Sequence, residues 1–555
     1  MDTLSTTLLA AIFLPLLGAA LLWVVQPLGR DAVRYTALGV TILTAVIAVY
    51  LCVSYVDAVK DVPAGEVKVV AQTDYAWLSP SVSSVDVKFS VGLDGLGVWM
   101  FGLSAILMVT AVLVSWEAIK EREALFYGML LLLEFGCLGV FTARDLLLFY
   151  IFFEFTLIPL FFLIGIWGSE ERRYAAIKFF LFTLAGSMLT FLGLLAIVVW
   201  DYQQQGNHQF RFAIHELVAG LKQNPLPLNW QLVLFIALFA GFAIKVPLFP
   251  LHTWLPLAHV QAPTAGSVIL AGILLKIGVY GFLRFSIPLL PDATAVCVPA
   301  LLWLSVAGII YGALVALAQA DIKRLIAYSS VSHLGVCMLG LFALNPLGVQ
   351  GSVLQMVNHG ISTGALFALV GMVYERYHTR QLADLSGLAY RTPLLAACMV
   401  FFTFSSIGVP ALNGFAGEIM ILLGMFQRAS TQAPAVMKSQ WMVISVLSLS
   451  SVVLGAWYML YLVRSVFFGP LKEPEEAAHH HIDDMNWREI LALAPLAVLA
   501  LWIGLAPQHF LQPMAPAIEQ AYKQAAERVG QPYQANEPRA VIPQQKPTEA
   551  IARVR

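Results

Sequence analysis

Apolar segments long enough to cross a lipid bilayer recur along most of this chain. A helix of about 20 apolar residues spans the hydrocarbon core. Only 12% of the residues are charged, whereas a soluble domain carries roughly 25% and needs them to cover its surface. We therefore predict an all-α integral membrane protein with about fourteen transmembrane helices. The expected spans are 5–25, 33–56, 92–115, 125–142, 145–167, 175–200, 230–250, 264–288, 296–318, 324–343, 350–373, 393–426, 441–468 and 488–510.

Two of these spans are interrupted by helix breakers. The span 230–250 contains KVPLFP, and the span 393–426 contains SSIGVPALNGFAGE. Proline removes a backbone donor, and in lipid the freed carbonyls must find another partner. The stretches GFAIKVPLFPLH (241–252) and FSSIGVPALNGF (404–415) are also weakly similar to each other. Paired broken helices of this kind are typical of inverted-repeat transporters, whose binding sites lie at the breaks.

Several acidic and basic side chains lie inside the apolar spans. A charge near the bilayer centre costs about 2.5–3.5 kcal/mol, so such residues face a partner or water and mark ion pathways. A static ion pair that joins helices is the alternative, but apolar replacements of such pairs are often neutral or stabilising. We predict a proton-translocation site of Glu154, Lys245, Lys276 and Glu418, with a secondary relay of Glu134, His333 and His359.

Lysine suits proton transfer at such a site. Removal of water favours its neutral form and a nearby carboxylate favours its charged form, so loss of the carboxylate would release the lysine proton. Histidine, with an ordinary pKa of about 6.5, can pass the proton on. Each charge moved against 100 mV costs about 2.3 kcal/mol, so an external source of energy must drive net transport.

No motif for such an energy source is present in the sequence. The chain lacks a phosphate-binding loop and a dinucleotide fingerprint, and its five cysteines are scattered singly. We therefore expect neither a cofactor nor a metal site in this chain. The run His479-His480-His481 is interpreted as a solvated loop, with a metal site as the alternative. The net charge of -1 gives no indication of a nucleic-acid partner.

The distribution of basic residues predicts the orientation. Alternate loops hold most of the Lys and Arg, and the positive-inside rule places these loops in the cytoplasm and both termini outside. The N-terminal segment is expected to remain as a first helix and not to be cleaved as a signal peptide. The loops 57–89 and 201–228 are then external, and the polar tail after about 511 is expected to be poorly ordered or to lie on a neighbour. Residues at helix ends, expected at the membrane interface, are Asp145, Asp321, Lys323 and Arg324.

Four stretches around the intramembrane charges carry a family resemblance. They are FYIFFEFTLIPLFFLIGIWG, FAIKVPLFPLHTWLPLAHVQAPTAGSVILAGILLKIGVYG, ADIKRLIAYSSVSHLG and NGFAGEIMIL. In order and spacing they resemble the antiporter-like membrane subunits of proton-pumping NADH:quinone oxidoreductase, respiratory complex I. The resemblance runs from about residue 90 to about residue 470. Within this family, a glutamate at position 418 resembles the pattern of chain M, the counterpart of mitochondrial chain four.

This resemblance implies a fold and a role for each charged residue. It implies two inverted five-helix repeats, each with a broken helix. Glu154 would set the protonation of Lys245, Lys276 would connect to a central hydrophilic axis through His333 and His359, and Glu418 would pass the proton to the far side. The expected divisions are 1–90 (N-terminal helices and external loop), 91–290 (first repeat), 291–470 (second repeat) and 471–555 (last transmembrane helix and polar tail).

The resemblance also implies an assembly. The chain would be a translocase subunit of the bacterial inner membrane, without a redox site of its own, flanked by sister antiporter-like subunits and other membrane and peripheral subunits of complex I. NADH, FMN, iron–sulfur clusters and quinone would be bound by those partners, whose quinone reduction would drive proton transfer. The alternatives are a subunit of a multisubunit cation/proton antiporter or of a membrane-bound hydrogenase, and a structural membrane spacer whose charges are dispensable.

Overall fold

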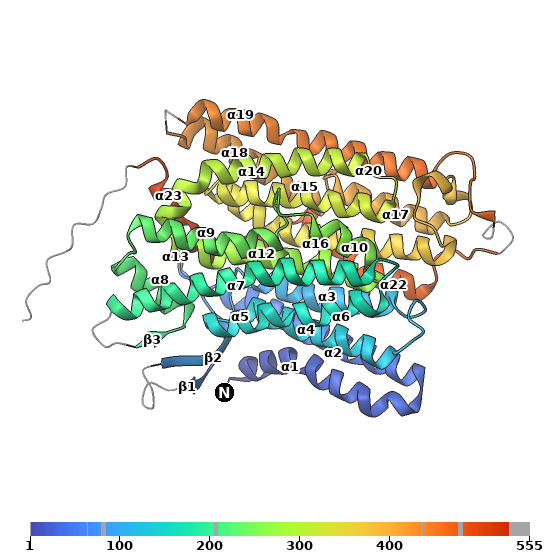
Figure 1. Ribbon diagram of the computed structural model, residues 1–555, viewed down its shortest axis with the longest axis horizontal. Helices are drawn as coiled ribbons and strands as arrows, with labels where there is room; N and C mark the ends of the chain where they lie inside the picture. The colour runs from blue at the N-terminus through green and yellow to red at the C-terminus, as the bar shows by residue number, and fades with distance from the viewer. Residues whose placement is uncertain are drawn as a thin grey trace, which may run out of the picture.

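The computed structural model describes residues 2–63, 65–78, 85–204, 209–434, 437–475 and 481–531, and in this part of the chain long helices run side by side in one bundle (Figure 1). Twelve helical segments of the described residues are long and apolar enough to cross a membrane. Two predicted spans, 92–115 and 393–426, contain the shorter apolar helices Val98–Val114 and Pro393–Ser406 instead. The all-α, multi-pass membrane architecture is therefore confirmed, with twelve full-length spans by length and composition where about fourteen were predicted.

Most of the helices follow one another with short connections, and the long connection between α2 and α3 contains two strands. The first part of the chain forms α1 (Thr3–Val25), η1 (Gln26–Leu28), α2 (Arg30–Val59), α3 (Val98–Val114), α4 (Glu123–Thr142), α5 (Leu146–Phe155), α6 (Leu157–Trp167), α7 (Arg172–Gln204), α8 (Ile214–Gln223), α9 (Leu228–Lys245) and α10 (Trp254–Gln261). The second part forms α11 (Thr264–Ile269), η2 (Leu270–Leu274), α12 (Leu275–Gly281), η3 (Phe282–Ser286), α13 (Ile287–Leu289), α14 (Pro291–Leu317), α15 (Ile322–Phe342), α16 (Pro346–Tyr377), η4 (Leu382–Asp384), η5 (Leu388–Tyr390), α17 (Pro393–Ser406), α18 (Asn413–Gln427), η6 (Arg428–Gln432), α19 (Lys438–Ser448), α20 (Ser450–Phe467), α22 (Trp487–Leu505) and α23 (Gln508–Arg528).

A small sheet covers one end of the bundle, on the left in Figure 1. Strands β1 (Val70–Leu78) and β2 (Val85–Leu93) pair antiparallel, and β3 (Phe210–Arg211) pairs parallel with β2. Strands β1 and β3 lie in the two segments that were predicted only as long external loops, and β2 begins in the first of these segments and ends inside the predicted span 92–115. In β2, Val85, Val87, Phe89 and Val91 alternate with other residues, which is the period-two signal of a half-buried strand.

Helix α23 corrects the prediction for the start of the polar tail. It packs along this chain's own bundle, against α14 and α16. Met514, Ile518 and Ala525 are completely buried, and their spacing gives an apolar stripe on an otherwise polar helix. The low average hydropathy of the segment concealed this stripe. The rest of the tail, 532–555, lies outside the described residues.

The two predicted helix breaks lie where the sequence places them. Helix α9 ends at Lys245 and α10 begins at Trp254, while α17 ends at Ser406 and α18 begins at Asn413. Side chains and turn contacts satisfy the freed backbone groups, as the interior of a membrane requires. At the first break the indole of Trp254 donates to the carbonyl of Ile244 at 3.0 Å. At the second, the side-chain amide of Asn358 donates to the carbonyl of Asn413 at 2.7 Å.

The segment Thr264–Leu289 lies at the centre of the bundle, and its most apolar stretch is entirely buried. It is not a regular helix, because two π-helical turns, η2 and η3, stand on either side of α12. Such turns are rare and occur frequently at functional sites. Lys276 is the second residue of α12, so the irregular backbone flanks one of the predicted proton-carrying residues.

Candidate functional site

Two predicted residues from distant parts of the chain meet at the centre of the bundle. The Nζ atom of Lys276 lies 2.7 Å from Nδ1 of His359, a residue of α16. The same Nζ donates to the carbonyl oxygen of Ala271, which belongs to the π-helical turn η2. Lys276 is 0% exposed. A hydrogen bond between a buried lysine and a buried imidazole gives the two groups a direct route for exchange of a proton.

His359 continues this contact to a second predicted histidine. The ring centroids of His333, on α15, and His359 lie 5.6 Å apart. Both side chains are buried, and Nε2 of His359 has no hydrogen-bond partner among the described residues. Lys276, His359 and His333 therefore form a buried line of three basic side chains, called the central line below.

The far end of the central line reaches two hydroxyl groups. Nε2 of His333 lies 3.3 Å from the Oγ atom of Ser406 and 3.2 Å from the hydroxyl of Tyr458. Ser406 is the last residue of α17, at the second helix break. The sequence prediction did not include these hydroxyls, since nothing in the spacing of single Ser and Tyr residues distinguishes them from ordinary core residues.

Glu418 lies close to the same helix break. Its Oε1 accepts a hydrogen bond from Ser451 at 2.7 Å, and a Cβ atom placed on Gly408 would lie 3.3 Å from its Oε2. Gly408 has a φ angle of 74°, which a residue without a side chain adopts at no steric cost. Ser451 and Tyr458 are seven residues apart on α20, which is about two helical turns and places them on one face. One face of α20 therefore contacts both His333 and Glu418.

Glu154 and Lys245 form a second group. Lys245 is the buried last residue of α9, and its Nζ lies 4.8 Å from the centroid of the Phe153 ring on α5. Each of the two residues exerts the largest electrostatic effect of any charged group on the other. Within the described residues, however, they form no direct salt bridge. This arrangement differs from a static ion pair, in which the carboxylate and the ammonium are in direct contact.

The two groups are packed against each other. Gly278 on α12 lies so close to the first break that an added Cβ would stand 2.6 Å from the carbonyl oxygen of Phe242 and 2.9 Å from the backbone nitrogen of Val246. Lys245 is next to Val246, and Lys276 is two residues before Gly278. The break after Lys245 and the helix that carries Lys276 are therefore in direct backbone contact.

Glu134 is buried on α4 close to this second group. Its carboxyl oxygens have no hydrogen-bond partner among the described residues, and Glu134 and Lys245 both act electrostatically on Cys137. A buried polar group without a partner is costly, and each native instance calls for a specific explanation. Glu134 makes no hydrogen bond to the central line among the described residues, and Cys137, one turn along α4, is the residue on which both Glu134 and Lys245 act.

Sequence reasoning missed a further buried lysine and histidine. Lys323, predicted at the interface, is instead buried, and its Nζ donates to the carbonyl of Ala262 at 2.6 Å. His259 on α10 is buried with no hydrogen-bond partner for either ring nitrogen among the described residues, and its ring is stacked on Phe367 with a centroid distance of 4.4 Å. Lys323 and Lys276 are the two charges that act on His259. The position of His259 just after a helix break was the available signal.

The other residues predicted at the interface occupy helix ends. Asp145 and Asp321 cap α5 and α15 through hydrogen bonds to backbone N–H groups, as helix N-caps do. Asp145 is nevertheless buried, and this burial raises its pKa to about 6. Arg324 is exposed. The first two residues of the His479-His480-His481 run lie outside the described residues, and within the described part His481 pairs with Asp483 at 3.1 Å.

A buried ion cluster, also missed, anchors the helix that carries Lys276. Arg284 in η3 donates two hydrogen bonds to Asp94, at 2.6 and 2.7 Å, and Arg144 lies 3.5 Å from the same carboxylate. Burial alone would raise the pKa of Asp94, but Arg284 and Arg144 outweigh it and hold this pKa at about 2. The bidentate geometry fixes the end of the central segment to the loop before α3.

The comparison with protein families decides the membership of the chain. Residues 143–455 match the family described as NADH:quinone oxidoreductase/Mrp antiporter, TM, which is more than half of the chain. The chain belongs to this family. The matched residues include Glu154, Lys245, the three residues of the central line and Glu418. Glu134 lies before the matched residues.

Individual relatives agree with this membership and confirm the resemblance to chain M. The chain is 39% identical to NADH-quinone oxidoreductase subunit M of Rhodobacter capsulatus, over 91% of this chain and 94% of the relative. It is similar to a chain of respiratory complex I from Thermus thermophilus with bound NADH, with a TM-score of 0.78, 32% identity, and coverage of 94% of this chain and all of that chain. The Mrp complex from Dietzia sp. shares the fold with a TM-score of 0.75 at 21% identity, over 95% of this chain and 100% of that chain.

Proposed function

We propose that this family member is a proton-translocating membrane subunit of an NADH:quinone oxidoreductase of the complex I type. The observation that carries the proposal is the central line, in which Lys276, His359 and His333 stand within contact distance at the buried centre of the bundle. The naming of the Rhodobacter capsulatus relative as subunit M of NADH-quinone oxidoreductase supports the assignment of the assembly.

In this proposal Glu154 controls whether Lys245 keeps its proton. The two charges influence each other without a direct salt bridge, so a small displacement or the neutralisation of Glu154 changes the charge balance at Lys245. A buried ammonium group that loses its carboxylate partner becomes an unpaired buried charge, which costs on the order of several kcal/mol. Lys245 therefore releases its proton. The backbone contact between the break after Lys245 and Gly278 brings this event next to Lys276.

The proton then passes along the central line. It moves from Lys276 to His359 through their hydrogen bond and on to His333. The hydroxyls of Ser406 and Tyr458 receive it from His333, and Glu418 takes it near the second break. His259, on which both Lys323 and Lys276 act electrostatically, refills the line from the side of the bundle where Lys323 lies. Waters complete the steps that exceed hydrogen-bond distance.

The energy for this transfer comes from partner subunits. The chain would act as part of a translocase without a redox site of its own, and NADH, FMN, iron–sulfur clusters and quinone would be bound elsewhere in the assembly. Within the described residues there is no group of three or more His, Cys, Asp or Glu side chains placed to hold a metal. We place the chain in the bacterial inner membrane, with both termini on the outer side and sister antiporter-like subunits as neighbours.

A cation/proton antiporter subunit is the second candidate, because the family description and the Mrp complex both include antiporters. The two functions differ in the source of energy. In vesicles that contain the purified native assembly, our proposal predicts that NADH and a quinone acidify the lumen and that a sodium gradient does not. Proton movement driven by sodium alone, without a response to NADH, would favour the antiporter and reject the proposal.

A further inference from the structure

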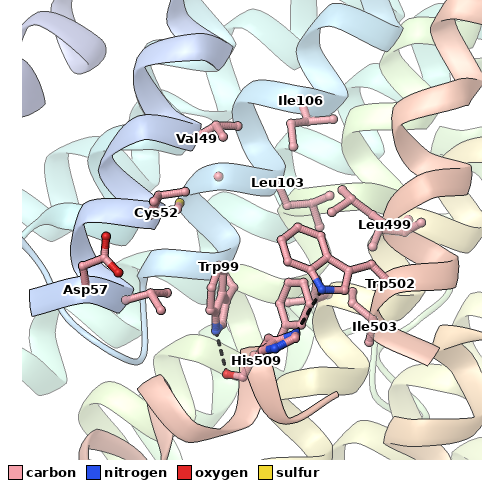
Figure 2. Close-up of a pocket in the computed structure, with 16 residues that line it drawn as sticks. Val49, Cys52, Asp57, Trp99, Leu103, Ile106, Leu499, Trp502, Ile503 and His509 are labelled. Atoms are coloured by element: carbon pink, nitrogen blue, oxygen red, sulfur yellow. Dashed lines mark hydrogen bonds between the residues drawn. The ribbon is translucent and has the colours of Figure 1, made fainter. Parts of the chain in front are cut away.

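An apolar groove runs along the outside of the bundle between α2 and α22. One part is a cavity of about 300 Å³ lined by residues of α2, α3 and α22 and the start of α23 (Figure 2), together with two residues of α16. A second cavity of about 350 Å³ follows along the same helices. Val49 and Ile106 line both cavities, so the two form one continuous groove.

The groove has the length of a lipid chain. It extends along α2 from Ile42 to Asp57, which corresponds to about 22 Å of helix. This length exceeds the roughly 15 Å that one leaflet contributes to the hydrocarbon core of about 30 Å, so the groove can hold the whole of an acyl chain from one leaflet. Apart from Thr110, the lining between these ends is apolar or weakly polar, with Leu103, Leu499 and Ile503 among its residues.

The polar end of the groove carries a hydrogen-bond donor of fixed orientation. The indole N–H of Trp502 donates to Nδ1 of His509 at 3.1 Å, as the dashed line in Figure 2 shows. A neutral imidazole whose Nδ1 accepts a hydrogen bond carries its proton on Nε2. His509 is exposed, so its Nε2–H is available at the mouth of the groove. Trp99 stands beside it and donates to the carbonyl of Phe510 at 2.9 Å.

These features together match the ends of a phospholipid. Tryptophan side chains are enriched at the level of the lipid headgroups, and here Trp99 and Trp502 flank the end of the groove that carries His509. The opposite end is lined by Ile42, Leu491 and Pro495. An acyl chain in the groove would cover the apolar side chains that line it. At the other end of the lipid, a phosphate oxygen would accept a hydrogen bond from the Nε2–H of His509.

We propose that one glycerophospholipid binds in this groove, with an acyl chain between α2 and α22 and its phosphate on His509. Two residues of the lining connect this groove with the proposed proton route. Val357 and Ile361, which line the cavity, stand on either side of His359 in the sequence of α16. The bound chain therefore packs against the segment of α16 that carries His359. The proposal concerns this surface alone and does not depend on the proposed function.

The test uses the native assembly in its membrane and a phosphatidylethanolamine that carries a photoreactive diazirine in one acyl chain. After irradiation, peptide mass spectrometry locates the label. We expect label on peptides of α3 and α22 around Leu103 and Leu499. The variant Val49→Trp fills the junction of the two cavities, so the amount of label on these peptides should fall at least tenfold. The matched control Leu43→Trp adds the same side chain on α2 at a residue outside the groove lining and should keep the label.

A second variant separates the headgroup contact from the chain contact. His509→Leu removes the donor and leaves the apolar groove intact, so the amount of label should fall severalfold with its location unchanged. Intact assembly of each variant is checked by native gel electrophoresis. Equal labelling of Val49→Trp and Leu43→Trp, an absence of label at α3 and α22, or crosslinks from these helices to a neighbouring subunit in place of lipid would overturn the proposal.

Discussion

Lys276 and His359 are separated by 83 residues in the sequence, yet their side-chain nitrogens lie 2.7 Å apart at the buried centre of the bundle. The contact joins the irregular segment around α12 to α16. Because the hydrogen bond is already formed, a proton needs no large movement of either helix to cross it. What must change is the relative proton affinity of the two groups, which the charges around Lys245 and Glu154 can alter.

The first prediction concerns His359. His359→Ala removes the acceptor of Lys276 and interrupts the central line, so proton pumping and coupled quinone reduction should fall sharply. A positioned acid–base group typically contributes about 10²–10⁴-fold, and we expect a loss at or below the lower end because water can fill the space. His378→Ala is the control, since His378 is exposed at the end of α16. The measurement is the rate of proton pumping in reconstituted vesicles. Full pumping activity of the His359→Ala variant would reject the place of His359 in the proton route.

The second prediction concerns Glu154. Glu154→Ala and Lys245→Ala should leave assembly largely intact and sharply lower both pumping and coupled quinone reduction. Glu154→Asp should retain partial activity, since its charge persists with a shorter reach. The measurement is the rate of NADH-driven acidification of vesicles. Equal losses in the Asp and Ala variants would argue against electrostatic control of Lys245 by Glu154.

The third prediction concerns the anchor between Asp94 and Arg284. Removal of one partner from a buried ion pair costs about 3–5 kcal/mol because the other charge is left unpaired. Asp94→Asn should therefore lower the midpoint of thermal unfolding of the assembled complex. The exposed Asp61→Asn, in the loop after α2, should leave it unchanged. The same midpoint in both variants would show that the pair does not anchor the central segment.

The pH dependence of this anchor follows from the lowered pKa of Asp94. The pKa of about 2 in the folded chain lies below the ordinary value of 3.8. The carboxylate therefore contributes its full stability above about pH 4, and this contribution is lost as the pH falls toward 2. Asp94→Asn should remove this part of the acid sensitivity. The measurement compares the shift of the thermal midpoint between pH 6 and pH 4 with the shift between pH 4 and pH 3, and the second shift should be smaller in the variant than in the unmodified chain.

The fourth prediction concerns Gly408. A side chain at its φ of 74° is strained by about 1–2 kcal/mol, and the new Cβ would press toward Oε2 of Glu418, 3.3 Å away. Gly408→Ala should lower both stability and pumping. Gly39→Ala is the matched control, because Gly39 lies within α2 and has no atom within 4 Å of an added Cβ. Alanine is preferred to glycine there by roughly 0.5–1 kcal/mol, so the control should be neutral or slightly stabilising.

The membrane class and the two helix breaks were predicted from the sequence and are confirmed, and the sequence also singled out the three side chains that the structure brings together in the central line, whose role stays a prediction. A charge or a proline inside an apolar span can be found in this way because it is conspicuous against its neighbours. The pairing of Asp94 with Arg284 and the approach of Tyr458 to His333 could not be found in this way, since both depend on packing between helices far apart in the chain. The burial of Lys323 could not be found from the sequence either, because it depends on cover of this helix end by another part of the chain, here the residues around Ala262.

The most direct test of the account is the number of protons moved per NADH oxidised by the assembly with Lys276→Met. Methionine keeps the length of the side chain and removes its ionisable group, while the exposed Lys222→Met serves as the control. The account predicts a lower ratio and slower coupled turnover in Lys276→Met, with normal assembly, and unchanged values in Lys222→Met. An unchanged ratio and rate in Lys276→Met would contradict the claim that protons pass along the central line.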